Sequence, residues 1–511
     1  MKDYSFGNFL RELRERRGLS QVQFGALVGV SNKAVSKWEN GSSMPKSPIL
    51  FRLSEFLGVT VDDLLACKYR SSESNRKGIF AMKKQKELWK NVYDALRERY
   101  GNTPPLAMVN RLESEKAEIE GTDFIVYLNL LAVLRKNAEE SGHHVRLFDG
   151  CSGFYTAYLL GVTDLDPMPP HYFCPDCGTV EFVPDTTIWW DLPQKTCACG
   201  CDMQRDGCGL PFEAYRPHYQ RINLSIWVDT GFYSAAETII RDYFADTPLV
   251  TFDACGTHSP DEWITFIVLP PDKQEFARNN PVISFEENRF TFKEHPYVHL
   301  VKRNDMDSYR MLEQETNTSF DRIPYLETGI LEAFAAADTE GIPEFWTKYI
   351  QEILLEYPPK SYSDLLRINS MLLVSRYSHT QTEGNTHHCT RGYIHDHIKN
   401  PSSPAFRDDI FLHVQSRMTA HGHTDTGFAY AVMRDAYRGI YGKNGMDDAT
   451  RAHLLEIGVS PDYIDTLTDI RYIFFKYRAV LDVRDALILM WYKRHYPEIF
   501  EQTVRIHAPV K

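Results

Sequence analysis

The sequence lacks any long apolar run: no stretch of about eighteen apolar residues occurs among its 511 residues. The first residues, MKDYSFGNFLRELRERR, also lack the apolar centre of a secretory signal peptide. These two absences predict a cytoplasmic protein with no membrane partner.

The chain also lacks an excess of basic residues. Its formal net charge is −12, which argues against nucleic-acid binding by the whole surface. Residues 1–66 differ, because their nine basic and seven acidic residues give +2, whereas the other 48 basic and 62 acidic residues give −14. Only the N-terminal segment therefore has a charge that favours approach to DNA phosphates.

Cysteine is scarce over most of the chain, but six of the ten cysteines fall between Cys174 and Cys208. Such crowding in a long cytoplasmic chain indicates a metal site rather than disulfides. The length predicts several domains, and the 43% of hydrophobic residues can fill large cores.

Residues 1–66 have the pattern of a small all-helical domain. Apolar residues at helical spacing predict a first helix that ends near Gly18, and a capping box of Ser20 and Gln23 predicts a second. Ser31 can cap a third helix, NKAVSKWEN, and LFRLSEFLGVTVDDLL adds two more. The segment is therefore expected to be a five-helix domain.

The third helix has one apolar and one polar side. Val35 and Trp38 are expected in the core, and the opposite side can reach base edges and phosphates in a major groove. The predicted DNA-contacting residues are Gln21, Ser31, Asn32, Lys33, Ser36 and Lys37.

Four landmarks occur in order in this segment: GLSQ, GVSNKAVSKWENG, Pro45 and LGVTVDDLL. They resemble the Xre/Cro/phage-repressor family of helix-turn-helix domains. The resemblance implies double-stranded DNA as partner, bound by a homodimer at a two-fold symmetric site. The alternative is a five-helix interaction bundle that has lost DNA binding.

Residues 67–82 are polar and are expected to form a linker. Further on, a Cys-x-x-Cys pair is followed after nineteen residues by Cys-Ala-Cys-Gly-Cys. Two such turns can hold a tetrahedral zinc, and four thiolates leave no open position for catalysis, so the zinc would be structural. The favoured ligands are Cys174, Cys177, Cys197 and Cys199, with Cys201 as the alternative and Cys208 outside the site. A cluster of unligated thiols is the competing interpretation.

Around these cysteines the sequence reads DLDPMPPHYFCPDCGTVEF and WWDLPQKTCACGCDMQRDGCGLPFEAY. These stretches, together with downstream ones such as GIPEFWTKYIQEIL and ILMWYKRHYPEIF, resemble the PolC-type DNA polymerase III alpha subunit. The resemblance covers roughly residues 84–505. It implies a mixed α/β palm-like region over 83–300 with a zinc knuckle over 170–210, and a mainly helical fingers-like region over 301–511. The predicted fold class is thus a multidomain, helix-rich α+β protein.

The carboxylates with which this family holds two metal ions are missing. Arg221 and Asn223 stand where the family has an Asp-x-Asp pair, and Thr291 stands at the third aspartate. Neither arginine nor threonine replaces a carboxylate ligand of a divalent cation, and asparagine is a weak substitute. The resemblance therefore implies a polymerase fold without catalysis.

Two further motifs of the family, the loop that cradles the incoming triphosphate and a motif of the fingers, are also altered. Its Gly-Ser-Arg-Gly-Ser phosphate loop corresponds to Leu147–Cys151, which places Asp149 where an arginine is needed, and its Lys-Ala-His-Ala becomes residues 476–479, KYRA. A shifted alignment, in which Asp229, Asp253 or Asp261 holds the metals, is the alternative.

The favoured function is a sequence-specific DNA-binding protein, a transcriptional regulator whose polymerase-like region binds DNA, a replication protein or another copy of itself. The first rival is a DNA-directed DNA polymerase with relocated carboxylates. The second is a metal-dependent nuclease or hydrolase that uses the cluster from His387 to His397, although a polar loop is the simpler interpretation of that cluster.

Overall fold

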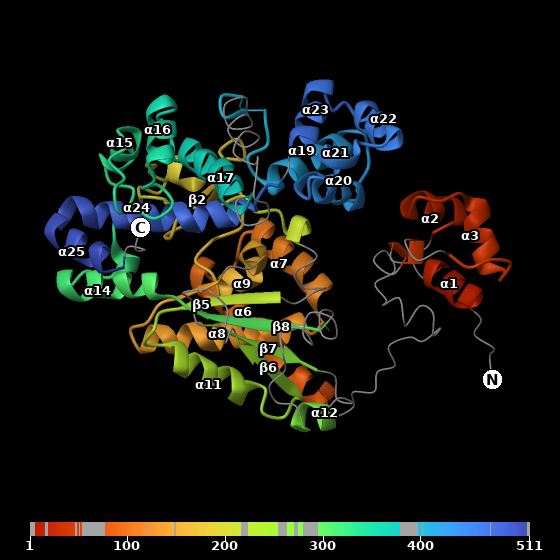
Figure 1. Cartoon of the computed structure of the whole chain (residues 1–511), viewed down its shortest axis with the longest axis horizontal. Coiled ribbons are helices and arrows are strands. Elements are labelled where there is room, and N and C mark those ends of the chain that lie inside the picture. Colours follow the sequence, from red (N-terminus) through yellow and green to blue (C-terminus); the bar gives the residue numbers. More distant parts are fainter. Residues whose placement is uncertain are drawn as a thin grey trace. The chain divides into compact units, whose positions relative to one another are not determined.

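The computed structural model in Figure 1 divides into two compact units, residues 1–83 and 84–511. It describes residues 6–15, 19–45, 49–50, 52–53, 77–120, 122–147, 150–215, 223–253, 263–269, 274–279, 295–378, 397–400, 402–470 and 472–507. Helix α6 (Lys77–Tyr100) begins within the segment expected to be a linker. No helix in these ranges is long and apolar enough to cross a membrane.

The first unit contains α1 (Phe6–Glu15), α2 (Gln21–Val28) and α3 (Asn32–Glu39). Their apolar faces form one buried cluster with Leu50 and Leu53: Phe9, Leu10, Leu13, Phe24, Val28, Val35 and Trp38. Gly7 lets α1 approach the end of α3, because a Cβ there would lie 2.5 Å from the carbonyl oxygens of Trp38 and Glu39. The last two expected helices fall largely in residues 54–66, outside the described residues.

The second unit is built around a five-stranded sheet with the order β1-β5-β8-β7-β6. The strands are β1 (Val145–Leu147), β5 (Asn223–Val228), β6 (Leu249–Asp253), β7 (Trp263–Val268) and β8 (Tyr297–Lys302). Only β5 and β8 run parallel, and the other neighbouring pairs are antiparallel. One face, with Leu224, Ile226 and Val298, joins the main core together with residues of α8 (Phe124–Glu140) and α11 (Tyr233–Tyr243).

A smaller sheet, in the order β3-β2-β4, carries the cysteine segment. Its strands are β2 (His171–Phe173), β3 (Val180–Phe182) and β4 (Gln204–Asp206). The ring of Phe173 meets the edge of Tyr100, the last residue of α6, at 4.8 Å between centroids. This contact fastens the small sheet to the helices α6, α7 (Leu106–Ile119) and α9 (Tyr155–Leu159).

Helices make up most of the rest of this unit. They are α12 (Gln274–Asn279), α14 (Asp307–Thr316), α15 (Ile330–Ala335), α16 (Lys348–Glu356), α17 (Tyr362–Ser378), α19 (Arg407–Ala420), α20 (Gly427–Tyr437), α21 (Ile440–Asn444), α22 (Asp448–Glu456), α23 (Pro461–Asp469), α24 (Lys476–His495) and α25 (Pro497–His507). Fifteen residues of α24 are buried, and in Figure 1 α24 lies between α15–α17 on one side and α14 on the other.

The palm-like and fingers-like regions expected on either side of residue 300 share one continuous core, from Leu88 to Phe500. At their junction α14 presents polar residues every third position. Asp307 accepts hydrogen bonds from Thr230, and Glu313 lies 2.8 Å from Nε2 of His144. The two regions therefore form one unit, and the observed architecture is a helix-rich α+β fold preceded by a helical N-terminal unit.

Candidate functional site

Helix α3 has the two faces that its sequence predicts. Ser31 caps it, with Oγ accepting from the backbone N–H of Ala34 at 3.3 Å. Val35 and Trp38 are buried, whereas Asn32, Lys33 and Lys37 are exposed and Ser36 is half-buried. The sequence therefore correctly predicted which side of α3 is buried, whereas DNA contact by its polar side stays a prediction.

The start of α2 carries an interaction that sequence reasoning missed. The capping box is confirmed, because Ser20 N donates to Gln23 Oε1 at 2.9 Å and Gln23 N donates to Ser20 Oγ at 3.3 Å. Gln21, however, donates its side-chain amide to Oε2 of Glu39 at 2.8 Å. Gln21 is thus held by the last residue of α3, which a local pattern could not reveal.

Glu39 is the centre of a buried polar network. Its carboxylate accepts Nε of Arg14 at 2.6 Å and Nη2 of the same residue at 3.0 Å, and Arg11 lies 3.5 Å away. Burial by itself would raise the pKa of Glu39, but hydrogen bonds from Arg14 and Gln21 hold that pKa below its usual value. The carboxylate therefore remains charged and ties α1, α2 and α3 together.

Four cysteine sulfurs converge at one end of the small sheet, and they are the four favoured from the sequence. The sulfurs of Cys174, Cys177, Cys197 and Cys199 all lie within 4.8 Å of one another. The distance between Sγ atoms is 3.4 Å for Cys174 and Cys199 and 3.5 Å for Cys177 and Cys197. A tetrahedral zinc with bonds of 2.3 Å requires sulfurs about 3.8 Å apart, so this group can hold such an ion.

Two tight turns present these sulfurs. Gly178 and Gly200 adopt φ values of +73° and +91°, and the N–H of each donates to the carbonyl of Cys174 or Cys197, respectively. Cys201 lies outside the sulfur group and its thiol contacts the carbonyl of Asp202 at 3.4 Å. Cys208 is buried in the main core.

The central strands of the large sheet carry no carboxylates. β5 reads NLSIWV, β7 reads WITFIV and β8 reads YVHLVK. The backbone of Asn223 begins β5, whereas Arg221 and Thr291 lie outside the described residues. The face opposite the main core instead presents His299, whose Nδ1 lies 2.8 Å from Oγ1 of Thr265, and burial lowers the pKa of His299 to about 4.

Two arginines place their guanidinium groups near the ring of Trp227 in β5, and each also forms an ion pair. The guanidinium of Arg303 lies 4.1 Å from the Trp227 ring centroid and that of Arg478 lies at 5.7 Å. Both are ion-paired, Arg303 with Asp305 at 2.5 Å and Arg478 with Asp482 at 2.9 Å. Burial would raise the pKa of Asp305, but Arg303 keeps it below its usual value. These carboxylates already have cationic partners.

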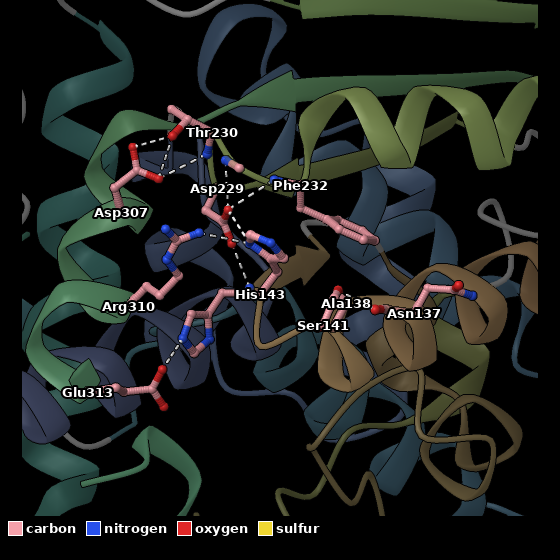
Figure 2. Close-up of polar contacts among 12 residues, drawn as sticks. Asn137, Ala138, Ser141, His143, Asp229, Thr230, Phe232, Asp307, Arg310 and Glu313 are labelled. Carbon is pink, nitrogen blue, oxygen red and sulfur yellow. Dashed lines mark hydrogen bonds and ion pairs between the residues drawn. The ribbon is translucent and has the colours of Figure 1, made fainter. Parts of the chain in front are cut away.

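Asp229, proposed above as a relocated metal ligand, is surrounded by donors (Figure 2). It is fully buried, and its carboxylate accepts the backbone N–H groups of His144, Gly231 and Phe232 at 2.8, 3.0 and 3.1 Å. The ring of His143 adds a contact at 2.8 Å. Asp229 therefore stabilises the turn between β5 and α11. The side chain of Asp253 and all of Asp261 lie outside the described residues.

In the two stretches matched to the family's phosphate loop and fingers motif, most of the described residues are buried. Gly150–Gly153 form a buried turn, in which a Cβ on Gly153 would lie 2.5 Å from the ring of Tyr215. Phe148 and Asp149 lie outside the described residues. Lys476 is buried, its Nζ donates to the carbonyl of Thr187 at 2.5 Å, and burial lowers its pKa.

Of the possible ligands in the cluster from His387 to His397, the structure describes one, His397. His387, His388, Cys389 and His395 lie outside the described residues. His397 lies 3.0 Å from Oγ of Ser403 through Nδ1 and 3.6 Å from a carboxylate oxygen of Asp469 through Nε2.

Comparison with known proteins bears out both resemblances. Residues 10–64 match the helix-turn-helix family, and residues 304–383 match the bacterial DNA polymerase III alpha subunit finger domain. The chain is 24% identical over 495 residues to the PolC-type DNA polymerase III of Oceanobacillus iheyensis, covering 81% of this chain and 33% of that protein. The Streptococcus pyogenes protein is 24% identical over 490 residues, covering 80% of this chain and 32% of its own length. The chain thus spans about a third of these relatives.

Proposed function

We propose that this helix-turn-helix protein is a sequence-specific DNA-binding transcriptional regulator whose polymerase-like region is catalytically inactive and serves to bind a partner. The recognition surface is the polar side of α3 with Gln21: Ser31, Asn32, Lys33, Ser36 and Lys37. Backbone N–H groups at the start of α3 and the two lysines are suited to phosphates, and the domain would bind as a homodimer to a two-fold symmetric site.

The observation that supports inactivity is the absence of carboxylates from β5, β7 and β8. Phosphoryl transfer by two metal ions needs acidic side chains that gather the cations where the primer and triphosphate meet. Here the nearby acids Asp305 and Asp482 are bound to arginines, and Asp229 is saturated with hydrogen bonds.

The four-cysteine centre is proposed to hold a structural zinc. Its ligands would be Cys174, Cys177, Cys197 and Cys199, and the ion would join the two turns at the end of the small sheet. Zinc supplies four strong bonds between segments some twenty residues apart, and it takes no part in a reaction.

The function is tested by selecting fragments from random DNA with the full chain and with a matched Lys33→Ala/Lys37→Ala variant. Enrichment of a two-fold symmetric sequence by the full chain, lost in the double variant, is the expected result. Recovery of no sequence preference by the full chain would contradict the proposal.

The second candidate, a DNA-directed DNA polymerase, is favoured by the similarity to PolC-type enzymes over 81% of the chain. Primer extension with magnesium or manganese separates the two functions. We expect no nucleotide incorporation above that of a matched Asn223→Ala variant. Incorporation that Asp253→Asn or Asp261→Asn abolishes would establish the polymerase instead.

For the partner of the polymerase-like region, the net charge of −14 outside residues 1–66 favours a protein, such as a replication protein, over DNA. Binding of naked DNA at physiological salt by a full chain with both lysines of α3 replaced would argue for DNA.

A further inference from the structure

Three histidines gather on the surface of the helices α19 to α23, which form one group in Figure 1. His421 and His423 flank Gly422 just after α19, and His453 lies in the last turn of α22. The ring centroids of His423 and His453 are 6.2 Å apart. Cε1 of His421 lies 3.9 Å from the position that a Cβ of Gly458 would take, directly after α22. The fold therefore brings together three imidazoles from two segments that are distant in the sequence.

The chain after α19 is shaped to present two of these rings. Gly422 adopts a φ of +80°, and the N–H of His423 donates to the carbonyl of Met418 at 3.0 Å. This turn leaves His421 and His423 exposed, and the side chain of His453 is 34% exposed. All three rings are therefore accessible to an ion from solvent.

Two of the rings have an acceptor at Nδ1. Nδ1 of His421 lies 3.0 Å from the carbonyl oxygen of Arg417, and Nδ1 of His453 lies 3.1 Å from a carboxylate oxygen of Glu456. Because these oxygens only accept, Nδ1 carries a proton in both rings, and Nε2 of each neutral ring presents a lone pair. Proteins fix the tautomer and the orientation of metal-binding histidines in this way, with a carbonyl or a carboxylate behind the ring.

The ring of His453 is also held from its other side. Phe428, at the start of α20, meets it edge to face with 4.6 Å between the ring centroids. The ring is therefore fixed by Phe428 and Glu456 together, and it provides a rigid side to which the exposed rings of the loop can move.

The donor atoms select the class of ion. Imidazole nitrogen suits zinc, nickel and copper ions, whereas magnesium and calcium prefer oxygen ligands. With metal–nitrogen bonds of about 2.0–2.1 Å, two rings on one tetrahedral ion have centroids about 5 Å apart, so His423 and His453 need to approach by only about 1 Å. Among the described residues, only the four cysteines form a group of ligand atoms that all lie within 4.8 Å of one another. The histidine group therefore has to close around an ion, and the exposed side chain of His423 can make that movement.

We propose that His421, His423 and His453 form a binding site for one divalent transition-metal ion, with Glu456 as a positioning residue that holds His453. The ion joins the loop after α19 to the end of α22 and restrains both segments. This site is separate from the four-cysteine centre, because its ligands are nitrogens and lie on different elements.

The first test is a calorimetric titration of the full chain with nickel(II), after the cysteine centre has been loaded with zinc. The wild type should bind nickel, and His423→Ala and His453→Ala should each weaken that binding about tenfold or more. The matched control is His495→Ala, which removes a part-exposed histidine whose Nε2 lies 3.1 Å from Glu327, and it should bind nickel as the wild type does. Equal nickel affinity in the wild type and the double variant His423→Ala/His453→Ala would overturn the proposal.

The role of Glu456 is tested by two substitutions of a side chain that is 77% exposed. Glu456→Ala removes the acceptor behind His453 and should weaken nickel binding about 10- to 100-fold. Glu456→Gln should restore part of this affinity, because its amide oxygen can still accept from Nδ1. Nickel affinity that is unchanged in Glu456→Ala would contradict the positioning role.

Hydrogen exchange of the same proteins locates the bound ion. Nickel should slow the exchange of amides in residues 419–426 and 448–458 of the wild type, and it should leave these amides unchanged in the double variant. Equal slowing in both proteins, or slowing only elsewhere in the chain, would show that nickel binds at another place and would refute the site.

Discussion

The buried pair of Arg14 and Glu39 provides the sharpest test of how the N-terminal unit is stabilised. The Glu39 side chain is 0% exposed and that of Arg14 is 9% exposed. Glu39→Ala would leave the buried guanidinium with the carbonyl of Leu19 and the exposed carboxylate of Glu15 as its acceptors, and would also release the amide of Gln21. Removing one partner of a buried ion pair typically costs about 3–5 kcal/mol, because the remaining charge stays uncompensated.

Such a loss is a large part of the total stability of a small domain, about 5–15 kcal/mol. Since each 1.4 kcal/mol corresponds to a factor of ten, the constant for opening this unit should rise by about 10² to 10³ or more. Hydrogen exchange of the α3 amides, followed by mass spectrometry on the full chain, measures that constant for this unit separately from residues 84–511.

Two control variants separate the effect of losing a buried partner from the effect of losing an exposed one, and from the effect of a lone buried charge. Glu15 also contacts Arg14, at 3.2 Å, but its side chain is 59% exposed, so Glu15→Ala should cost no more than about 1 kcal/mol. The double variant Arg14→Met/Glu39→Met should recover much of the stability lost in Glu39→Ala, because no lone charge remains. An increase in α3 exchange below about fivefold in Glu39→Ala would refute the reasoning.

Since the folded pKa of Glu39 is lowered, the contribution of Glu39 to the stability of this unit should be present at neutral pH and be lost as the pH falls below the usual carboxyl range.

Three further predictions concern the other sites. Cys177→Ser should lose the bound zinc, and its cobalt-substituted form should lose the intense charge-transfer bands, whereas Cys201→Ser should keep both the metal and the bands. Equal metal content in the two variants would exclude the proposed ligand set. Lys33→Ala and Lys37→Ala should each weaken binding to a selected DNA site about fivefold or more and reduce its salt dependence, and unchanged affinity in both would remove α3 from the interface. Gly231→Ala should destabilise the second unit by about 1–3 kcal/mol in thermal unfolding, because its Cβ would lie 2.6 Å from the ring of His143; an unchanged melting temperature would contradict this packing.

The sequence by itself determined the features that depend on neighbours along the chain. The caps at Ser20 and Ser31 join atoms three residues apart, and the side of α3 that holds Val35 and Trp38 follows from helical periodicity. The two cysteine turns are likewise local, because Gly178 and Gly200 shape each turn next to the sulfurs it presents. The helices of the N-terminal unit and the group of four converging cysteines were therefore predictable without a structure.

Only the tertiary structure decided which distant groups meet. Glu39 contacts Arg14, which is 25 residues away in the sequence, and His144 contacts Glu313, which is 169 residues away. No periodic pattern encodes contacts at such separations. The sequence could name Asp229 as a possible metal ligand, but only the fold surrounds it with backbone donors, and only the strand order leaves β5 beside the carboxylate-free β8. Hydrogen-bond saturation and burial are properties of a three-dimensional environment, and these properties decide whether a carboxyl group binds a metal, an arginine or a proton.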